Sequence, residues 1–222
     1  MNLAIHIEHT NLKPECTASD VITLCNEAVE HGFYAVCVAP YFVQLAKKTI
    51  KKSDVKIVTV VGFPFGYNMV SSKVEETKKA ITAGAHEVDM VMNIAAFKSG
   101  DIASVQNDIQ SVVTACHLQN KLVKVIIEIC YLTDEEIKFA CKLCADCEAN
   151  FVKTSTGYGP SGATVEAVQI MRKYLPKQVK IKAAGGIRDI AFARALIEAG
   201  ADRIGTSSGV KLVLDTEVQN EK

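Results

Sequence analysis

The stretch KIVTVVGFPFGYNMVSSKVEETKKAITAGAHEVDMVMNI (residues 56–94) decides the fold, because two apolar runs flank a helical pattern. The runs 56–63 and 86–94 are short and continuously apolar rather than alternating. Such runs are typical of parallel strands that are covered on both faces. The amphipathic segment 72–85 between them contains Gly84, and glycine supplies the left-handed residue that ends a helix. The stretch therefore predicts a strand–helix–strand unit.

The same unit recurs along the whole chain. Helical patterns that follow Cys16 and Ser71 are the clearest, and helices are expected to end at His31-Gly32, Ala83-Gly84 and Ala199-Gly200. The predicted strands are 4–10, 34–40, 56–63, 86–94, 124–130, 150–156, 179–185 and 201–208. Eight such units leave about 28 residues each, close to the minimum for a strand, a helix and two loops.

This pattern predicts an α/β protein with a (β/α)8 TIM barrel that forms a single domain over residues 1–222. The alternative is an open doubly wound sheet, which normally has five or six strands. No GxGxxG follows the first strong strand, so nothing supports a dinucleotide site. In a barrel, functional groups are expected at the carboxyl ends of the strands and in the loops that follow them.

Composition and charge narrow the function classes. Lys+Arg and Asp+Glu are both 25, so there is no basic excess for nucleic acid, and 49% hydrophobic residues exclude a disordered chain. No apolar run reaches the ~18 residues of a membrane span. Glu8 interrupts the N-terminus too early for the apolar part of a signal peptide. We expect a cytoplasmic protein with neither nucleic-acid nor membrane partners.

Eight cysteines are many for such a chain, and Cys141, Cys144 and Cys147 form CxxCxxC, a spacing found in iron–sulfur sites. The surrounding run has helical spacing and an N-cap at Thr133 or Asp134. Cysteines three apart share one broad helix face, where a free thiol packs like a small apolar side chain. We therefore expect reduced, buried thiols and no metal.

Charged residues inside apolar strands are the strongest indication of function. Asp89 lies in EVDMVMN, where it shares a face with Val91 and Asn93, and Lys153 lies in FVKTSTG. Lys180 and Lys182 share a face of the next strand, with Lys182 closer to its carboxyl end. Because an unpaired buried charge costs several kcal/mol, we expect Asp89, Lys153 and Lys182 to form one coupled cluster.

Such a cluster suits Schiff-base catalysis. A lysine attacks a carbonyl as its neutral amine, which is scarce at pH 7 for an ordinary pKa near ~10.4. A second ammonium nearby lowers that pKa. The Gly185-Gly186 pair and the run Gly205-Thr206-Ser207-Ser208-Gly209 follow the last two predicted strands. Loops in these positions often bind phosphate in barrel enzymes.

The chain resembles the deoxyribose-phosphate aldolases over nearly its whole length. The segments that carry the resemblance are HTNLKPE (9–15), CVAP (37–40), VGFPFG (61–66), EVDMVMNI (87–94), KVIIEICYLTDEE (124–136), FVKTSTGYGPSGAT (151–164), KAAGGIRD (182–189) and RIGTSSGV (203–210). The resemblance implies a class I lyase that interconverts 2-deoxy-D-ribose 5-phosphate with D-glyceraldehyde 3-phosphate and acetaldehyde, without metal or cofactor.

The resemblance also implies roles for single residues. Lys153 would form the Schiff base, Lys182 would depress its pKa, and Asp89 would transfer protons through water. Cys37 matches a cysteine near the family's substrate pocket, but for normal turnover we favour the interpretation that it is a packed core thiol. The residues that would hold the substrate phosphate are Gly157, Gly185, Gly186, Gly205, Ser207 and Ser208.

Three departures from the family pattern stand out. Glu8 replaces the usual aspartate before His-Thr, Tyr158-Gly159-Pro160 carries no lysine, and the chain ends at 218–222 without the tyrosine that some members have. The alternatives are a transaldolase or ketose-phosphate aldolase, which would use a ketone donor, and a sugar-phosphate-binding regulator. We expect a homodimer, since barrels of this size often pair.

Overall fold

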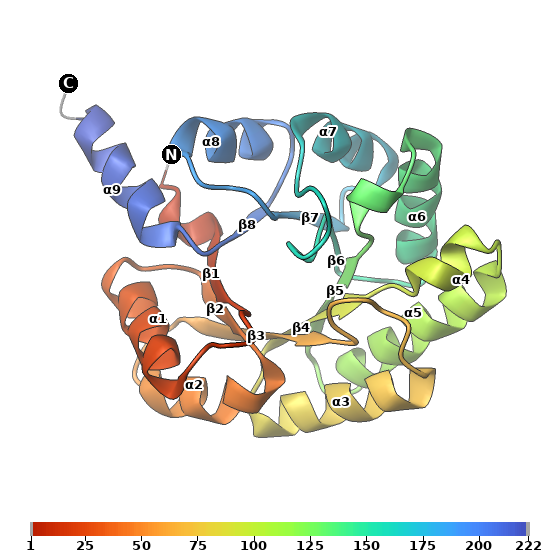
Figure 1. The fold of residues 1–222 in the computed structure, drawn as a ribbon, viewed down its shortest axis with the longest axis horizontal. Helices are drawn as coiled ribbons and strands as arrows, with labels where there is room; N and C mark the ends of the chain where they lie inside the picture. Colours follow the sequence, from red (N-terminus) through yellow and green to blue (C-terminus); the bar gives the residue numbers. More distant parts are fainter. Residues whose placement is uncertain (1, 221–222) are drawn as a thin grey trace.

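The computed structural model describes residues 2–220, and in it eight parallel strands close into a barrel (Figure 1). Each strand pairs with its neighbours in sequence, and β8 pairs with β1 to close the ring. The strands are β1 Ile7–Asn11, β2 Ala35–Val38, β3 Lys56–Val61, β4 Glu87–Val91, β5 Leu122–Ile126, β6 Phe151–Lys153, β7 Lys180–Ala184 and β8 Arg203–Thr206. The predicted (β/α)8 barrel is therefore confirmed.

Helices surround the barrel (Figure 1). The α-helices are α1 Ala18–Glu30, α2 Val43–Thr49, α3 Val70–Ala83, α4 Ile94–Lys98, α5 Ile102–His117, α6 Asp134–Asp146, α7 Val165–Tyr174, α8 Ile190–Glu198 and α9 Gly209–Asn220. Short 3-10 helices are η1 Ala4–His6, η2 Pro40–Phe42 and η3 Ile129–Tyr131. None of the helices within residues 2–220 is long and apolar enough to cross a membrane. Residues 221 and 222 of the C-terminal segment 218–222 lie outside the described residues.

Local sequence signals set where the helices begin and end. Thr17 with Asp20 and Thr133 with Glu136 form capping boxes at the starts of α1 and α6, so the N-cap of α6 is Thr133. Three helix ends were predicted at glycines, and all three glycines have positive φ: 65° at Gly32, 123° at Gly84 and 115° at Gly200.

Two predicted strands are displaced. Residues 4–6 form η1 rather than strand, so β1 begins at Ile7. The strand predicted at 124–130 is β5, Leu122–Ile126, and the chain turns beyond it because Glu128 has a φ of 52°. The apolar residues Ile127 and Ile129 extended the predicted strand, but they are buried beyond β5, and Ile129 begins η3.

The cysteines of CxxCxxC are packed inside the protein. Cys141 and Cys144 lie on the inner face of α6 and Cys147 ends that helix, and all three are fully buried. Burial raises the pKa of the Cys141 thiol to about 12 and that of Cys144 well above its usual range. The prediction of buried thiols is confirmed. No group of His, Cys, Asp and Glu side chains within residues 2–220 is arranged to hold a metal ion.

Candidate active site

The three charged residues singled out by the sequence meet inside the barrel. The Lys153 ammonium on β6 donates to Asp89 Oδ2 on β4 at 2.9 Å. The Lys182 ammonium on β7 donates to the same oxygen at 2.7 Å. Lys153 and Lys182 are register partners on adjacent strands, so both side chains point into the barrel at one level. One carboxylate oxygen is thus shared by two lysines.

Three further charged residues complete a network around these three. Glu8 stands out in the sequence only as a departure from the family pattern, and neither Glu87 nor Lys124 was singled out there as a site residue. Lys124 on β5 lies 3.1 Å from Asp89 Oδ1 and 3.4 Å from Glu8 Oε1, and it also bonds Glu87. Glu8 on β1 in turn bonds Lys182. The lumen network therefore consists of three carboxylates (Glu8, Glu87 and Asp89) and three lysines (Lys124, Lys153 and Lys182).

The signs in this network balance, and that balance decides which groups are charged. Burial alone would raise the pKa of Asp89, but Lys124, Lys153 and Lys182 hold its pKa well below the usual range. Burial alone would lower the pKa of Lys182, but Asp89 and Glu8 hold its pKa above the usual value. Asp89 is therefore a carboxylate and Lys182 an ammonium at neutral pH.

A cavity of about 710 Å³ opens above the network, at the carboxyl ends of the strands. Of the six charged residues in the lumen network, Lys153 is the one that lines this cavity. Lys182 and Lys124 are completely buried beneath it. A ligand in the cavity would therefore reach the amine of Lys153 first.

Five of the six residues expected to bind phosphate line the same cavity: Gly157, Gly185, Gly186, Gly205 and Ser207. Gly185 has a φ of 89° and its Cβ would lie 2.9 Å from the Gly162 Cα, so only glycine fits. Ser208 is not among the lining residues, and its N–H donates to Thr206 Oγ1 at 2.9 Å. Lys13 and Arg188 also line the cavity and supply cations that the sequence did not single out.

The lumen beside β2 and β3 is apolar. A small cluster of buried residues fills it: Ala35, Cys37, Val58 and Val60. Leu12 and Phe63 pack against this cluster, and Leu12 also lines the cavity. Cys37 is completely buried, and burial raises the pKa of its thiol. The structure thus places Cys37 in the wall of the lumen as a neutral, packed side chain.

Comparison with known proteins identifies the family. The model of the DeoC/LacD family aldolases matches residues 3–215. The chain belongs to this family. It is 55% identical to the deoxyribose-phosphate aldolase of Thermococcus gammatolerans over 215 residues, which is 96% of each chain. It is 47% identical to the deoxyribose-phosphate aldolase of Treponema denticola over 213 residues, 96% of this chain and 99% of the other.

Solved structures of the family have the same barrel. The tetrameric deoxyribose phosphate aldolase from Aeropyrum pernix superposes with a TM-score of 0.91 at 31% identity, covering 98% of this chain and 92% of that one. An aldolase called QR15 superposes with a TM-score of 0.93 at 39% identity, covering 99% and 97%. The DeoC/LacD aldolase fold and the arrangement of its eight strands are thus shared over the full barrel.

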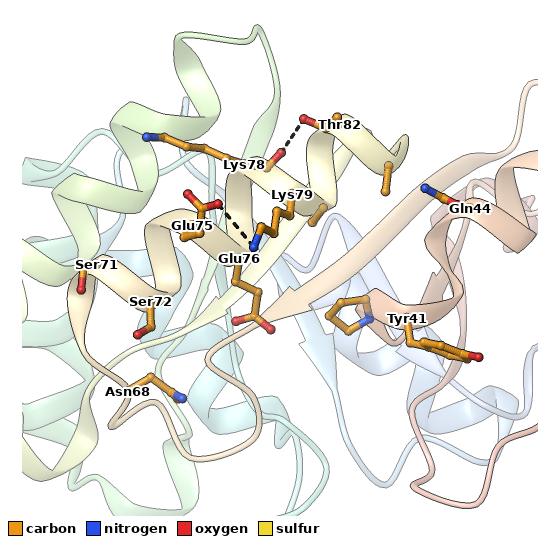
Figure 2. A pocket seen from close by; sticks show the side chains of 13 residues that line it. Tyr41, Gln44, Asn68, Ser71, Ser72, Glu75, Glu76, Lys78, Lys79 and Thr82 are labelled. Atoms are coloured by element: carbon orange, nitrogen blue, oxygen red, sulfur yellow. Dashed lines mark hydrogen bonds and ion pairs between the residues drawn. The ribbon is translucent and has the colours of Figure 1, made fainter.

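A second hollow of this DeoC/LacD aldolase lies outside the barrel and has a different lining. It measures about 1140 Å³ and lies between η2, α2 and α3 (Figure 2). Its charged residues are on the surface, for example Lys79, whose ammonium lies 3.5 Å from Glu75 along one helix face. None of the residues of the lumen network lines it. The chemistry of the family is therefore assigned to the cavity above Lys153.

Proposed function

We propose that the chain is a class I, Schiff-base aldolase that cleaves 2-deoxy-D-ribose 5-phosphate to D-glyceraldehyde 3-phosphate and acetaldehyde and catalyses the reverse reaction. One observation carries the proposal: Lys153 lines the cavity while its amine shares Asp89 Oδ2 with the buried Lys182. The relatives named deoxyribose-phosphate aldolase support the choice of substrate.

The shared oxygen lets Lys153 act as a neutral amine. When Lys153 loses its proton, Asp89 keeps two ammonium partners, Lys182 at 2.7 Å and Lys124 at 3.1 Å. The carboxylate is therefore never left unpaired in the barrel, where an uncompensated charge would cost several kcal/mol. The persistent ammonium of Lys182 also disfavours a second positive charge beside it. Both effects favour Lys153 as the nucleophile.

Cleavage begins when the Lys153 amine adds to the C1 aldehyde of the open-chain sugar phosphate. Loss of water gives a protonated imine, which withdraws electrons from C2. The proton of the C3 hydroxyl is then removed, with Asp89 acting through water, and the C2–C3 bond breaks as C3 becomes a carbonyl. The bond's electron pair forms an enamine on Lys153, and glyceraldehyde 3-phosphate leaves.

The second half of the reaction releases the two-carbon fragment. A proton returns to C2 of the enamine, and water hydrolyses the resulting imine to acetaldehyde and the free Lys153 amine. The apolar wall of Cys37, Val58 and Val60, with Leu12 above it, suits a fragment without polar substituents. Covalent attachment and the phosphate contacts together restrict the geometry of the reacting carbons, which can contribute ~7–11 kcal/mol in favourable cases.

The phosphate is assigned to the loops after β6, β7 and β8. Gly157, Gly185, Gly186, Gly205 and Ser207 line this part of the cavity, and we include Ser208 next to it. Glycines allow an anion close to backbone N–H groups. Arg188 adds a cation at the same rim.

The assay that tests the function compares two donors with the purified protein. We expect release of glyceraldehyde 3-phosphate from deoxyribose 5-phosphate, and condensation of acetaldehyde with glyceraldehyde 3-phosphate. Activity should persist in the presence of a metal chelator. Condensation with dihydroxyacetone phosphate instead of acetaldehyde would indicate a ketose-phosphate aldolase. Binding of the sugar phosphate without turnover would indicate a regulator.

The proposal also covers the domain bounds, the cellular location and the oligomeric state of the enzyme. We assign the single aldolase domain to residues 1–222, a cytoplasmic location and a homodimeric assembly. The relative from Aeropyrum pernix is a tetramer, whereas we expect this chain to form a dimer. Light scattering of the purified protein would distinguish a dimer from a tetramer.

A further inference from the structure

The loop after β6 is fixed firmly at its base. Glu128, which is buried after β5, accepts hydrogen bonds from the Thr156 N–H at 3.1 Å and from the Thr156 hydroxyl. The Thr156 hydroxyl oxygen in turn accepts from the Tyr158 N–H at 3.0 Å. Between them, Gly157 has a φ of 89°, which reverses the chain. The backbone of Tyr158 is therefore held relative to Lys153, which lies five residues earlier in the same segment.

The side chain of Tyr158 is held at its other end by different loops. Its hydroxyl donates to the Leu12 carbonyl oxygen, in the loop between β1 and α1, at 2.7 Å. Its ring meets that of Phe63, in the loop after β3, edge to face at 5.4 Å between centroids. Tyr158 and Leu12 both line the cavity above Lys153. Tyr158 thus connects three loops at the cavity.

The order of the strands shows which loops the hydrogen bond from Tyr158 to Leu12 connects. In the closed barrel, β7 and β8 lie between β6, which precedes Tyr158, and β1, which precedes Leu12. The hydrogen bond from Tyr158 to Leu12 therefore joins the two loops that flank the carboxyl ends of β7 and β8. The loops after those two strands carry Gly185, Gly186 and Ser207, to which the phosphate is assigned.

The loop joined in this way carries a cation. Lys13 follows Leu12 directly and lines the cavity. Its carbonyl accepts from the Cys16 N–H at 3.1 Å and its own N–H donates to Asn11 Oδ1 at 3.3 Å, so the turn is ordered locally. With Arg188 after β7, Lys13 after β1 would flank a phosphate from the other side.

Three carboxylates line the same part of the cavity, and two of them are already occupied. Asp20 accepts from the Thr17 N–H at 2.8 Å in the capping box of α1. Glu27 lies 2.6 Å from His9 Nε2. Glu15 is the third and belongs to the same turn as Lys13. Lys13 is therefore the cation of this turn that can offset the negative charge of Glu15.

We propose that Tyr158 is a positioning residue that holds the β1–α1 loop at the cavity, so that Lys13 and Arg188 flank the phosphate of the substrate. This inference rests on the proposed aldolase function. It assigns to the β6–α7 loop a part in phosphate selection although Tyr158-Gly159-Pro160 contains no cation.

Two substitutions test the proposal through the preference for phosphorylated substrate. Tyr158→Phe removes the bond to Leu12 but keeps the ring beside Phe63, and Lys13→Ala removes the cation. We expect each to lower the ratio of kcat/KM for deoxyribose 5-phosphate to that for deoxyribose by about two- to tenfold, the range of one lost hydrogen bond. The double variant should show less than the product of the two losses, because both act through one contact.

Tyr41→Phe is the matched control, since Tyr41 is 87% exposed in η2 and lines the outer hollow of Figure 2. It should leave the substrate ratio as in the natural sequence. Equal losses on both substrates in Tyr158→Phe, or an unchanged ratio, would overturn the proposal. Calorimetry with inorganic phosphate separates this result from the function itself. Wild-type protein that binds phosphate more tightly than both variants supports the positioning role even if the aldolase assay fails.

Discussion

The two halves of the barrel lumen differ in kind. Beside β2 and β3 the inward side chains are small and apolar: Ala35, Cys37, Val58 and Val60. On β4 to β7 the lumen instead holds charged side chains: Glu87, Asp89, Lys124, Lys153 and Lys182. The charged half sets protonation states, and the apolar half encloses carbon atoms. Class I aldol chemistry needs both halves. The charged half supports the reactive amine of Lys153, and the apolar half accommodates the two-carbon fragment, which has no polar substituent.

The difference also explains how so many charges remain inside one barrel. Buried ion pairs are tolerated when each charge has partners, and they become strongly destabilising when one partner is removed. Glu8 extends the charged half onto β1, where it contacts Lys124 and Lys182. The apolar half carries no charge that needs compensation, so changes there should be milder.

The largest expected effect comes from Lys182→Leu, which removes the ammonium next to Lys153. The remaining network has more carboxylates than lysines, and Asp89 loses one of the two ammonium partners that compensate it while Lys153 reacts, so turnover should fall by about 10²–10⁴-fold. Lys180→Leu is the matched control, because Lys180 lies on the same strand but is exposed at its amino end. Steady-state assays of both variants check this. A near-normal rate for Lys182→Leu contradicts the role given to that residue.

Lys124→Met tests whether the charged half is held together by its own pairs. Lys124 is completely buried and contacts all three carboxylates of the network, so its loss leaves them short of one partner. Unfolding in urea should show a loss of about 3–5 kcal/mol. Lys142→Met, which breaks an exposed pair with Asp146, should cost about 0–1 kcal/mol. Equal losses of unfolding free energy in Lys124→Met and Lys142→Met would show that burial of the network does not increase the cost of breaking an ion pair.

Acid should lower the free energy of unfolding through the carboxylates of the charged half, because the apolar half has no group that titrates in this range. Lysine partners hold the pKa values of Asp89 and Glu87 below the usual carboxyl range, against the opposing effect of burial. A lowered pKa in the folded state adds stability that is complete above the ordinary value of about 4 and is lost as the pH falls below it. The free energy of unfolding should therefore be level from about pH 7 to pH 5 and fall below about pH 4. Glu87→Gln should reduce that slope, and an unchanged slope would argue against it.

The smallest effect is expected in the apolar half. Cys37→Ala removes one sulfur atom from the lumen wall and no charge, and burial already keeps that thiol protonated. Turnover of deoxyribose 5-phosphate should stay within about threefold of the natural protein, because volume changes of this size are usually tolerated. A loss as large as that of Lys182→Leu would mean that the thiol takes part in catalysis.

The fold could be predicted because each unit carries its own signals. Continuous apolar runs marked the strands, and Gly32, Gly84 and Gly200 marked the ends of helices. The bounds were less accurate where apolar residues continue past a strand. Isoleucines at 127 and 129 extended the predicted strand 124–130, although β5 is Leu122–Ile126 and Glu128 turns the chain.

That displaced strand is the reason why Lys124 was missed. A strand that begins at residue 124 places Lys124 at its edge, whereas in β5 it is the central residue and register partner of Asp89. Glu87 shares strand parity with Asp89, which was a usable signal. The contacts of Tyr158 and the place of Lys13 depend on which loops meet across the barrel, and no local pattern contains that information.

The central claim is that Lys153, and not its buried neighbours, forms the covalent intermediate. Treatment of the protein with acetaldehyde and borohydride, followed by proteolysis and mass spectrometry, tests it most directly. We expect a reduced N-ethyl adduct on the peptide that contains Lys153, and none after Lys153→Leu. An adduct on Lys124 or Lys182, or no adduct in the natural sequence, would contradict the account.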